Sequence, residues 1–387
     1  MEIITGERED LYDMLSDALI QAREVKTNID KMALYNYIGN LYTSINVNDW
    51  SDFSVNYKDC FQNRRNYLKF LRMVHVYEDR FCQNFFDNKD FHEYYLGNIL
   101  LPYEVKMQDL AEVPVSEESQ YIGKDNFFEI LIGFFSTYGL EKAFRDFMDK
   151  NRVFNKIKKS EKDNYKGLTI FNPLNRDSAC LLTCADYDLD TMFTLVHEFG
   201  HIYDLSLLEG DISQEITNYS YLSCYPEVFS KLLEKLFLQY LIENNILVDI
   251  AKDKYIDSFL INHDFLLSCY MFSLISDKYF KGGKGLSISD DAFFREVSKH
   301  FKDTSLVREF IYKGQTDMFG DTLYAYGDVL STQLFDAVKE EGLDSVELKK
   351  FLAIRTGKFD PNFLLDSDYT PERFNKVFSK QVDLFYK

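Results

Sequence analysis

Residues 190–210 read DTMFTLVHEFGHIYDLSLLEG and contain the motif HExxH. The spacing of the apolar residues Met192, Phe193 and Val196 predicts a helix through this stretch. Asp190 is expected to cap its N-terminus, and Gly210 is expected to end it. The rest of the fold is expected to be arranged around this helix.

The motif places two histidines four residues apart, one turn above each other on one helix face. His197 and His201 can therefore offer two imidazole nitrogens to one metal ion, and a single zinc ion is the expected occupant. Glu198 lies beside that face, where it can accept a proton from a zinc-polarised water without being a ligand. The alternative is a pair of core histidines with no metal, because the chain has six histidines and a short motif can arise by accident.

A glycine stands in the middle of the predicted metal-binding helix. There it costs about 1 kcal/mol relative to alanine, so its presence needs a reason. The close approach of a second backbone at Gly200 would supply one.

A catalytic zinc site needs three protein ligands, and the next predicted helix offers the third. This helix starts at PEVFSKLLE, with Pro226 in its first turn, where a missing N–H does least harm. Glu227, 26 residues after His201, is the preferred ligand, and Glu215 is the competing candidate. Glu234, two turns further along, is expected to accept a hydrogen bond from one of the zinc histidines.

The composition bounds the partners and the compartment. The chain has 387 residues, a formal charge of −19 and 46% hydrophobic residues, enough to bury a large core in one or two domains. The acidic balance argues against nucleic acid and anionic membranes as partners. No secretion signal or membrane span is evident, so a cytoplasmic protein is expected. The six cysteines show no disulfide spacing and are expected to be buried thiols.

Several other segments have predictable structure. The first hundred residues have helical apolar spacing, and residues 127–150 predict a helix with a break near Gly139. Residues 156–167 are expected to form an exposed loop, and residues 179–188 a short strand that leads into the metal-binding helix. An exposed edge of such a strand could pair with a peptide laid over the metal.

Beyond the single motif, the chain resembles the zinc metallopeptidases of the thimet oligopeptidase and oligoendopeptidase F family. The similarity lies in YDLDTMFTLVHEFGH (187–201), PEVFSKLLE (226–234), LYAYGDVLS (323–331) and FLAIRTGKFDPNFLLDSDYTPERF (351–374). It extends over residues 95–387 and is most specific over residues 188–234. The resemblance implies a mainly α, zincin-like fold with two helical lobes around a groove and a small β-sheet beside the HExxH helix. It also implies a reduced N-terminal lobe (residues 1–95) and a catalytic domain (residues 96–387).

The same resemblance implies roles for individual residues. His197, His201 and Glu227 would be zinc ligands, Glu198 the general base, and Tyr326 a hydrogen-bond donor to the oxyanion, since a phenol stays protonated at neutral pH. The alternative for both Tyr324 and Tyr326 is that they are core aromatics. Tyr324 and Gly200 are expected in the substrate-binding region, and Asp204 is expected to hydrogen-bond a ligand imidazole.

This chain differs from the family in two places. The family usually has a histidine about ten residues before the position of Tyr326, where this chain has Gly314, Gln315, Thr316 and Asp317, and a histidine at the position of Asp204. The function expected is a monomeric zinc endopeptidase that cleaves short peptides. The alternatives are a zinc exopeptidase and a helical peptide-binding protein with a decayed metal site.

Overall fold

The structure is a computed structural model of the 387-residue chain. It describes residues 8–25, 30, 33–34, 37–41, 121–149, 153–156, 166–172, 177–183, 187–207, 225–255, 258, 295, 318–355 and 371–386. These residues are mainly helical and include one small sheet, which confirms the coarse fold prediction. Among them, no helix is long and apolar enough to span a membrane.

The principal helices and strands have the following bounds. The helices are α1 (Arg8–Glu24), α8 (Lys124–Thr137), α9 (Glu141–Asp149), α10 (Leu189–Ser206), α12 (Tyr225–Glu243), α16 (Met318–Glu341), α17 (Val346–Arg355) and α19 (Pro371–Tyr386). The strands are β1 (Val153–Lys156), β2 (Gly167–Asn172) and β3 (Asp177–Thr183). The 3₁₀ turn η3 (Gly342–Asp344) follows α16.

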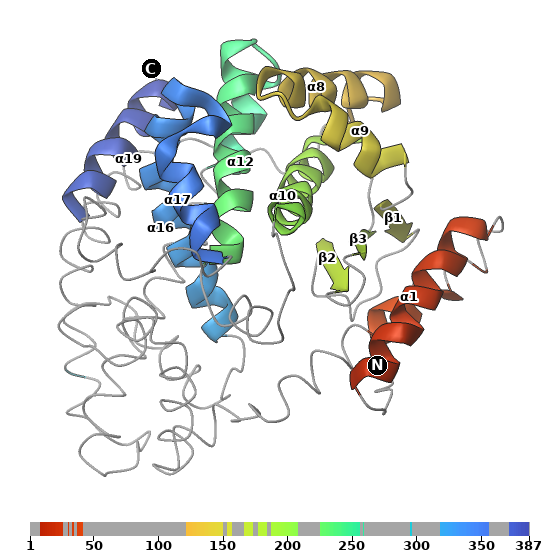
Figure 1. Cartoon of the computed structure of the whole chain (residues 1–387). Helices are drawn as coiled ribbons and strands as arrows, with labels where there is room; N and C mark the ends of the chain where they lie inside the picture. Colours follow the sequence, from red (N-terminus) through yellow and green to blue (C-terminus); the bar gives the residue numbers. More distant parts are fainter. Residues whose placement is uncertain are drawn as a thin grey trace, which may run out of the picture.

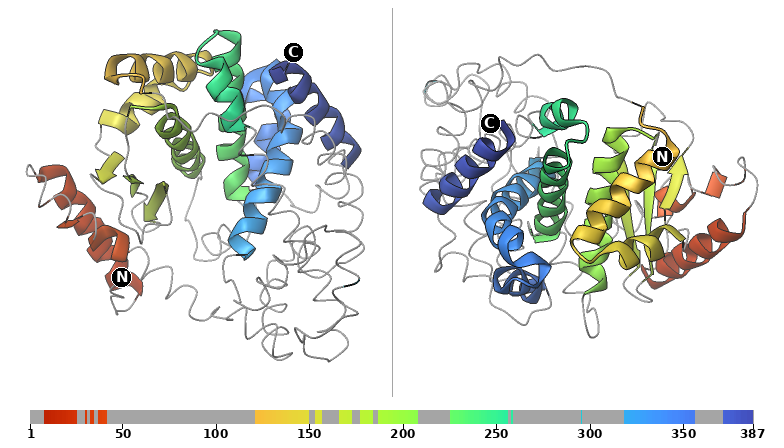
Figure 2. Two further views of the ribbon diagram at one scale, coloured as in Figure 1. Left: turned by 180° about the vertical axis from the view of Figure 1, so that it is seen from behind. Right: turned by 90° about the horizontal axis from the view of Figure 1, so that it is seen from above.

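The elements pack in a sequence of layers, which Figures 1 and 2 show from three sides. Helix α1 lies against the sheet, the sheet against α10, α10 against α12, α12 against α16, and α16 against α19. The HExxH motif is on α10, so it lies between the sheet and α12. Two different elements can therefore place side chains beside it.

The sheet has the strand order β1-β3-β2, with β1 parallel and β2 antiparallel to β3. Its side chains alternate between two faces, as the pleat requires. Ile170 and Ala179 join the apolar cluster with α1, while the Thr169 side chain reaches Glu198 on α10. The prediction of a strand before the metal-binding helix is confirmed, since β3 spans Asp177–Thr183.

Two expectations about this sheet need correction. Strand β3 is in the centre of the sheet, so its backbone groups are paired on both sides and cannot take up a peptide. The edge strand that contacts α10 is β2. The expected loop over residues 156–167 also takes in the last residue of β1 and the first of β2.

The cap predicted for the metal-binding helix is wrong by two residues. Asp188 is the N-cap, and its carboxylate accepts a hydrogen bond of 2.8 Å from the backbone N–H of Thr191. Asp190 lies in the first turn and pairs with Lys254 at 2.5 Å. Helix α10 ends at Ser206, before the predicted stop at Gly210.

Three other predictions are confirmed. The helix break near Gly139 separates α8 from α9, and the glycine has a φ of 70°. The helix expected from residue 226 is α12. The helical apolar spacing expected in the first hundred residues is present in α1, where Leu11, Leu15, Ala18, Leu19 and Ala22 are buried and Met14 is exposed. Cys180 is a buried free thiol; the other five cysteines and the proposed domain boundary at residue 95 lie outside the described residues.

Candidate metal centre

Two histidines of α10 and one glutamate of α12 come together in a single cluster. Among the described residues, His197, His201 and Glu227 form the group whose ligand atoms all lie within 4.8 Å of one another. The two Nε2 atoms are 3.0 Å apart. Glu227 Oε2 is 3.5 Å from His197 Nε2, and Glu227 Oε1 is 3.6 Å from His201 Nε2. The structure therefore brings together the three predicted ligands.

The two distances from Glu227 fit a small tetrahedral ion, whereas the two Nε2 atoms are slightly closer than tetrahedral geometry requires. Bonds of about 2.0–2.2 Å at tetrahedral angles place ligand atoms roughly 3.3–3.6 Å apart. Glu227 Oε2 is buried and accepts no hydrogen bond in the part of the chain that the structure describes. Burial raises the pKa of Glu227 to about 7, although His197 and Lys231 oppose the rise. A buried carboxylate oxygen with no donor is the kind of atom that a cation would satisfy.

Glu234 fixes the orientation of one histidine. His197 Nδ1 lies 2.5 Å from Glu234 Oε1, so an N–H at Nδ1 donates to the carboxylate and leaves the Nε2 lone pair facing the cluster. Burial alone would lower the pKa of His197, but the hydrogen bond to Glu234 and the nearby carboxylates raise it to about 8. The predicted hydrogen bond between Glu234 and one of the two histidines is therefore present.

Glu198 is held beside the cluster without joining the ligand triad. Its side chain is 6% exposed, and the Thr169 hydroxyl donates a hydrogen bond of 2.6 Å to its Oε2. A Cβ on Gly167 would stand 2.6 Å from Glu198 Oε1, so only glycine leaves room there. Burial raises the pKa of Glu198 above its usual value. Strand β2 therefore positions the predicted general base.

Gly200 lets the two ligand-bearing helices approach. A Cβ on this residue would stand 2.8 Å from the Cα of Ser230 on α12. The predicted approach of a second backbone is therefore confirmed. A contact between Gly200 and a substrate stays a prediction. The neighbouring residue Phe199 packs on Phe135 and Phe144 from α8 and α9, with ring centroids 4.6 and 5.6 Å away.

Three further residues were predicted to belong to the site: Tyr324, Asp204 and Tyr326. The Tyr324 ring lies nearly parallel to that of His197, with centroids 6.5 Å apart, and the side chain is 38% exposed. Asp204 is buried on α10, one turn beyond His201; its carboxylate accepts no hydrogen bond from either candidate ligand imidazole, so that prediction is wrong. Tyr326 belongs to α16, but its side chain lies outside the described residues, as do Glu215 and the whole of residues 314–317.

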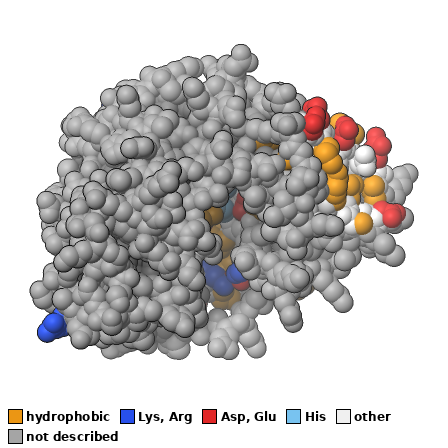
Figure 3. Space-filling model, turned by 90° about the horizontal axis from the view of Figure 1, so that it is seen from below, with side chains coloured by type: hydrophobic (Ala, Val, Ile, Leu, Met, Phe, Trp, Pro, Cys, Tyr) orange, Lys and Arg blue, Asp and Glu red, His pale blue; other side chains and the backbone are white. Residues whose placement is uncertain are grey.

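The cluster is visible from outside the molecule. Seen from below, the surface is hollowed, and a histidine side chain and an acidic side chain are visible inside the hollow (Figure 3). The described part of the chain contains two histidines, His197 and His201, so the visible ring is one of these.

Sequence reasoning missed three residues around the site. Gly167 and Thr169 belong to β2, a strand that was not predicted, and their roles depend on the pairing of that strand. Lys231 was detectable, because it lies four residues after Glu227 and three before Glu234, on one helix face. Its Nζ is 3.4 Å from Glu234 Oε1.

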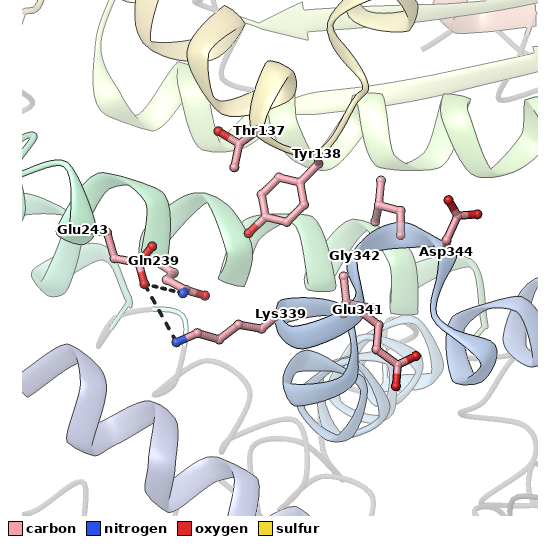
Figure 4. A pocket seen from close by; sticks show the side chains of 10 residues that line it. Thr137, Tyr138, Gln239, Glu243, Lys339, Glu341, Gly342 and Asp344 are labelled. Atoms are coloured by element: carbon pink, nitrogen blue, oxygen red, sulfur yellow. Dashed lines mark hydrogen bonds and ion pairs between the residues drawn. The ribbon is translucent and has the colours of Figure 1, made fainter.

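A second cavity lies at the other end of α12 (Figure 4). It has a volume of about 490 Å³ and is bordered by the C-terminal ends of α8, α12 and α16. Gln239 donates a hydrogen bond of 2.6 Å to Glu243, and Lys339 is 3.9 Å from the same carboxylate. Because these polar groups pair with one another, we assign no ligand to this cavity.

Comparison with known proteins adds no assignment. No family model, no curated protein and no solved structure matches the chain. The functional argument therefore rests on the geometry of the cluster and on the motifs.

Proposed function

We propose that this protein is a zinc-dependent endopeptidase that hydrolyses short peptides, with the zincin-like, oligoendopeptidase F-like architecture that its motifs resemble. The observation behind the proposal is the convergence of His197, His201 and Glu227 at 3.0–3.6 Å, with a second buried carboxylate, Glu198, beside them. This donor set, two imidazoles and one carboxylate, is one that catalytic zinc sites use with a fourth position left open.

The charge of the cluster favours a divalent cation. The carboxylates of Glu198, Glu227 and Glu234 are largely buried, and Lys231 is the ammonium group paired within this set. In the deprotonated state that binds a metal, with neutral imidazoles and ionised carboxylates, three negative charges against one positive charge leave a net charge of −2. Buried charge of one sign is unfavourable unless it is neutralised. A bound zinc ion would balance it and would supply Lewis acidity toward a peptide carbonyl and a water molecule.

The protein's own residues have separate tasks in this proposal. Glu198 takes the proton from the attacking water and passes it to the leaving amine, and the Thr169 hydroxyl holds the carboxylate in place. Tyr326 is proposed to donate a hydrogen bond to the oxyanion, which can be worth about 2.7–4 kcal/mol in such sites. Tyr324, beside His197 and partly exposed, is proposed to contact the substrate.

The edge of the sheet supports an extended peptide as substrate. Strand β2 pairs with β3 on one side only, and its other edge pairs with no strand among the described residues. Thr169 in this strand touches the proposed base. A peptide added along β2 would therefore run past Glu198. We propose β2 as the substrate edge, in place of the strand expected from the sequence.

The test combines metal analysis with peptide cleavage. Zinc per chain is measured on purified protein, and a library of internally quenched peptides blocked at both ends is incubated with wild type, Glu198→Gln and His201→Ala. We expect one zinc ion per wild-type chain and cleavage by wild type alone. Glu198→Gln should keep its zinc and lose turnover, and His201→Ala should lose both.

Each alternative function predicts a different result. Cleavage of peptides with free ends but not of blocked ones would indicate a zinc exopeptidase. One zinc per chain with peptide binding and no cleavage would indicate a peptide-binding protein with a decayed site. Turnover that survives in Glu198→Gln would exclude Glu198 as the base.

A further inference from the structure

A lysine lies behind the candidate metal centre, on the same helix as the third ligand. Lys231 is 14% exposed, and its Nζ is 3.4 Å from both Oε1 and Oε2 of Glu234. The same carboxylate receives the hydrogen bond from His197 Nδ1. Lys231 therefore contacts the group that orients a ligand histidine.

A second buried lysine anchors this arrangement to the neighbouring helix. Lys235, one turn after Lys231, pairs with Asp328 of α16, and both side chains are less than a tenth exposed. Burial alone would lower the pKa of Lys231, but the carboxylates of Glu234, Asp328 and Glu227 outweigh burial and raise it. Lys231 thus lies among the carboxylates of both helices.

We propose that Lys231 is a positioning residue of the metal centre, which holds the Glu234 carboxylate in the place where it orients the His197 ring. The inference rests on the metal centre proposed above. The two equal Nζ–O distances place the ammonium in front of the carboxylate and restrain its rotation. Without Lys231, the largely buried Glu234 carboxylate would keep its hydrogen bond to His197 but lose the ammonium group in front of it. Its negative charge would then be poorly compensated.

A purely structural role for Lys231 gives a different expectation. Its removal would then lower the stability of the α12–α16 contact and leave the metal affinity unchanged. A double-mutant cycle separates the two cases, because coupling through Glu234 makes the effects of the two residues non-additive.

The experiment measures the zinc dissociation constant by competition with a chelator at pH 7.5 for five proteins. These are wild type, Lys231→Met, Lys231→Arg, Glu234→Gln and the double variant Lys231→Met/Glu234→Gln. The visible spectrum of the cobalt-substituted forms reports ligand geometry, and thermal unfolding reports stability. Lys231→Gln, which keeps a hydrogen-bond donor, replaces Lys231→Met if the latter does not fold.

We expect Lys231→Met to weaken zinc binding by about tenfold to a hundredfold and to alter the cobalt spectrum. Lys231→Arg should restore most of the affinity. In the Glu234→Gln background, Lys231→Met should have no further effect on zinc binding. An unchanged dissociation constant in Lys231→Met or Lys231→Gln, or additive effects in the double variant, would overturn the inference. Absence of zinc binding by wild type would instead reject the proposed metal centre itself.

Discussion

The Cα of Ser230 lies 2.8 Å from the position that a Cβ on Gly200 would occupy. Real Cβ atoms do not approach a backbone carbon this closely, so α10 and α12 can pack at this separation only with glycine at residue 200. Three residues before Ser230 is Glu227, and three residues before Gly200 is His197. The contact between the two helices therefore sets the distance between ligands that come from different parts of the chain.

Replacement of this glycine should damage both stability and metal binding. Gly200→Ala gains about 1 kcal/mol of helix propensity, but forcing a methyl group into this contact costs about 1–3 kcal/mol. We expect a net loss of about 1 kcal/mol in the free energy of unfolding, together with weaker zinc binding, measured by denaturant titration and chelator competition. Gly133→Ala is a suitable control, because its Cβ would meet only the hydroxyl end of Tyr240. Equal effects of the two variants would contradict the assigned role.

Zinc affinity should rise with pH. The pKa of His197 is raised to about 8 and that of Glu227 to about 7, so both groups hold protons in the metal-free protein at pH values below these. A proton must leave before each group can bind zinc. We expect the apparent affinity to increase about tenfold per pH unit for each proton displaced below its pKa, and to level off above pH 8. Isothermal titration at pH 6, 7 and 8 in buffers of different ionisation heat measures the zinc affinity and the number of protons released on binding. Affinity independent of pH would contradict this account.

The hydroxyl of Thr169 should matter for turnover and not for metal content. Thr169→Val removes the hydrogen bond to Glu198 Oε2 and leaves a buried carboxylate with one donor fewer. Because that bond lowers a pKa that burial raises, its loss should raise the pKa of Glu198 further and move the acidic limb of kcat/KM to higher pH. We expect kcat to fall by about tenfold to a hundredfold at unchanged zinc content. Thr169→Ser keeps the hydroxyl and should behave like wild type; equal losses in both variants would argue against this bond.

The two aspartates at the start of α10 should differ in their effect on stability. Asp188→Ala removes the side-chain cap and should cost about 0.5–2 kcal/mol in the free energy of unfolding. Asp190→Ala removes partly exposed ion pairs with Lys254 and Lys166, which are worth about 0–1 kcal/mol. Thermal or denaturant unfolding of the two variants compares them. A larger loss for Asp190→Ala would reverse the assignment of the cap.

The parts of the site that local spacing determines could be predicted. A separation of four residues puts His197 and His201 on one helix face, whatever the rest of the fold. A third ligand was then expected from the next helix. The face of that helix with Glu227, Ser230 and Glu234 does contact α10. Gly200 was also informative. Glycine is unfavourable in a helix interior, so its presence indicated the close approach of a second backbone.

The parts that depend on strand pairing could not be predicted. The run at residues 156–167 is polar, so β1 and β2 on either side of it were not predicted. Without these strands, β3 was expected to have a free edge. Alternation of apolar and polar residues from Gly167 onward was a signal for β2. No local pattern, however, indicates that Thr169 would face Glu198, because that contact requires the sheet and α10 to be packed together.

The three candidate ligands are divided between two helices, so metal binding would also bear on the stability of the fold. His197 and His201 belong to α10, Glu227 belongs to α12, and 26 residues separate the last two along the chain. An ion bound by all three would act as a cross-link between the sheet side and the α16 side of the molecule, comparable to a disulfide that closes a loop of that length. Catalytic activity and part of the stability of the fold would then depend on the same ion.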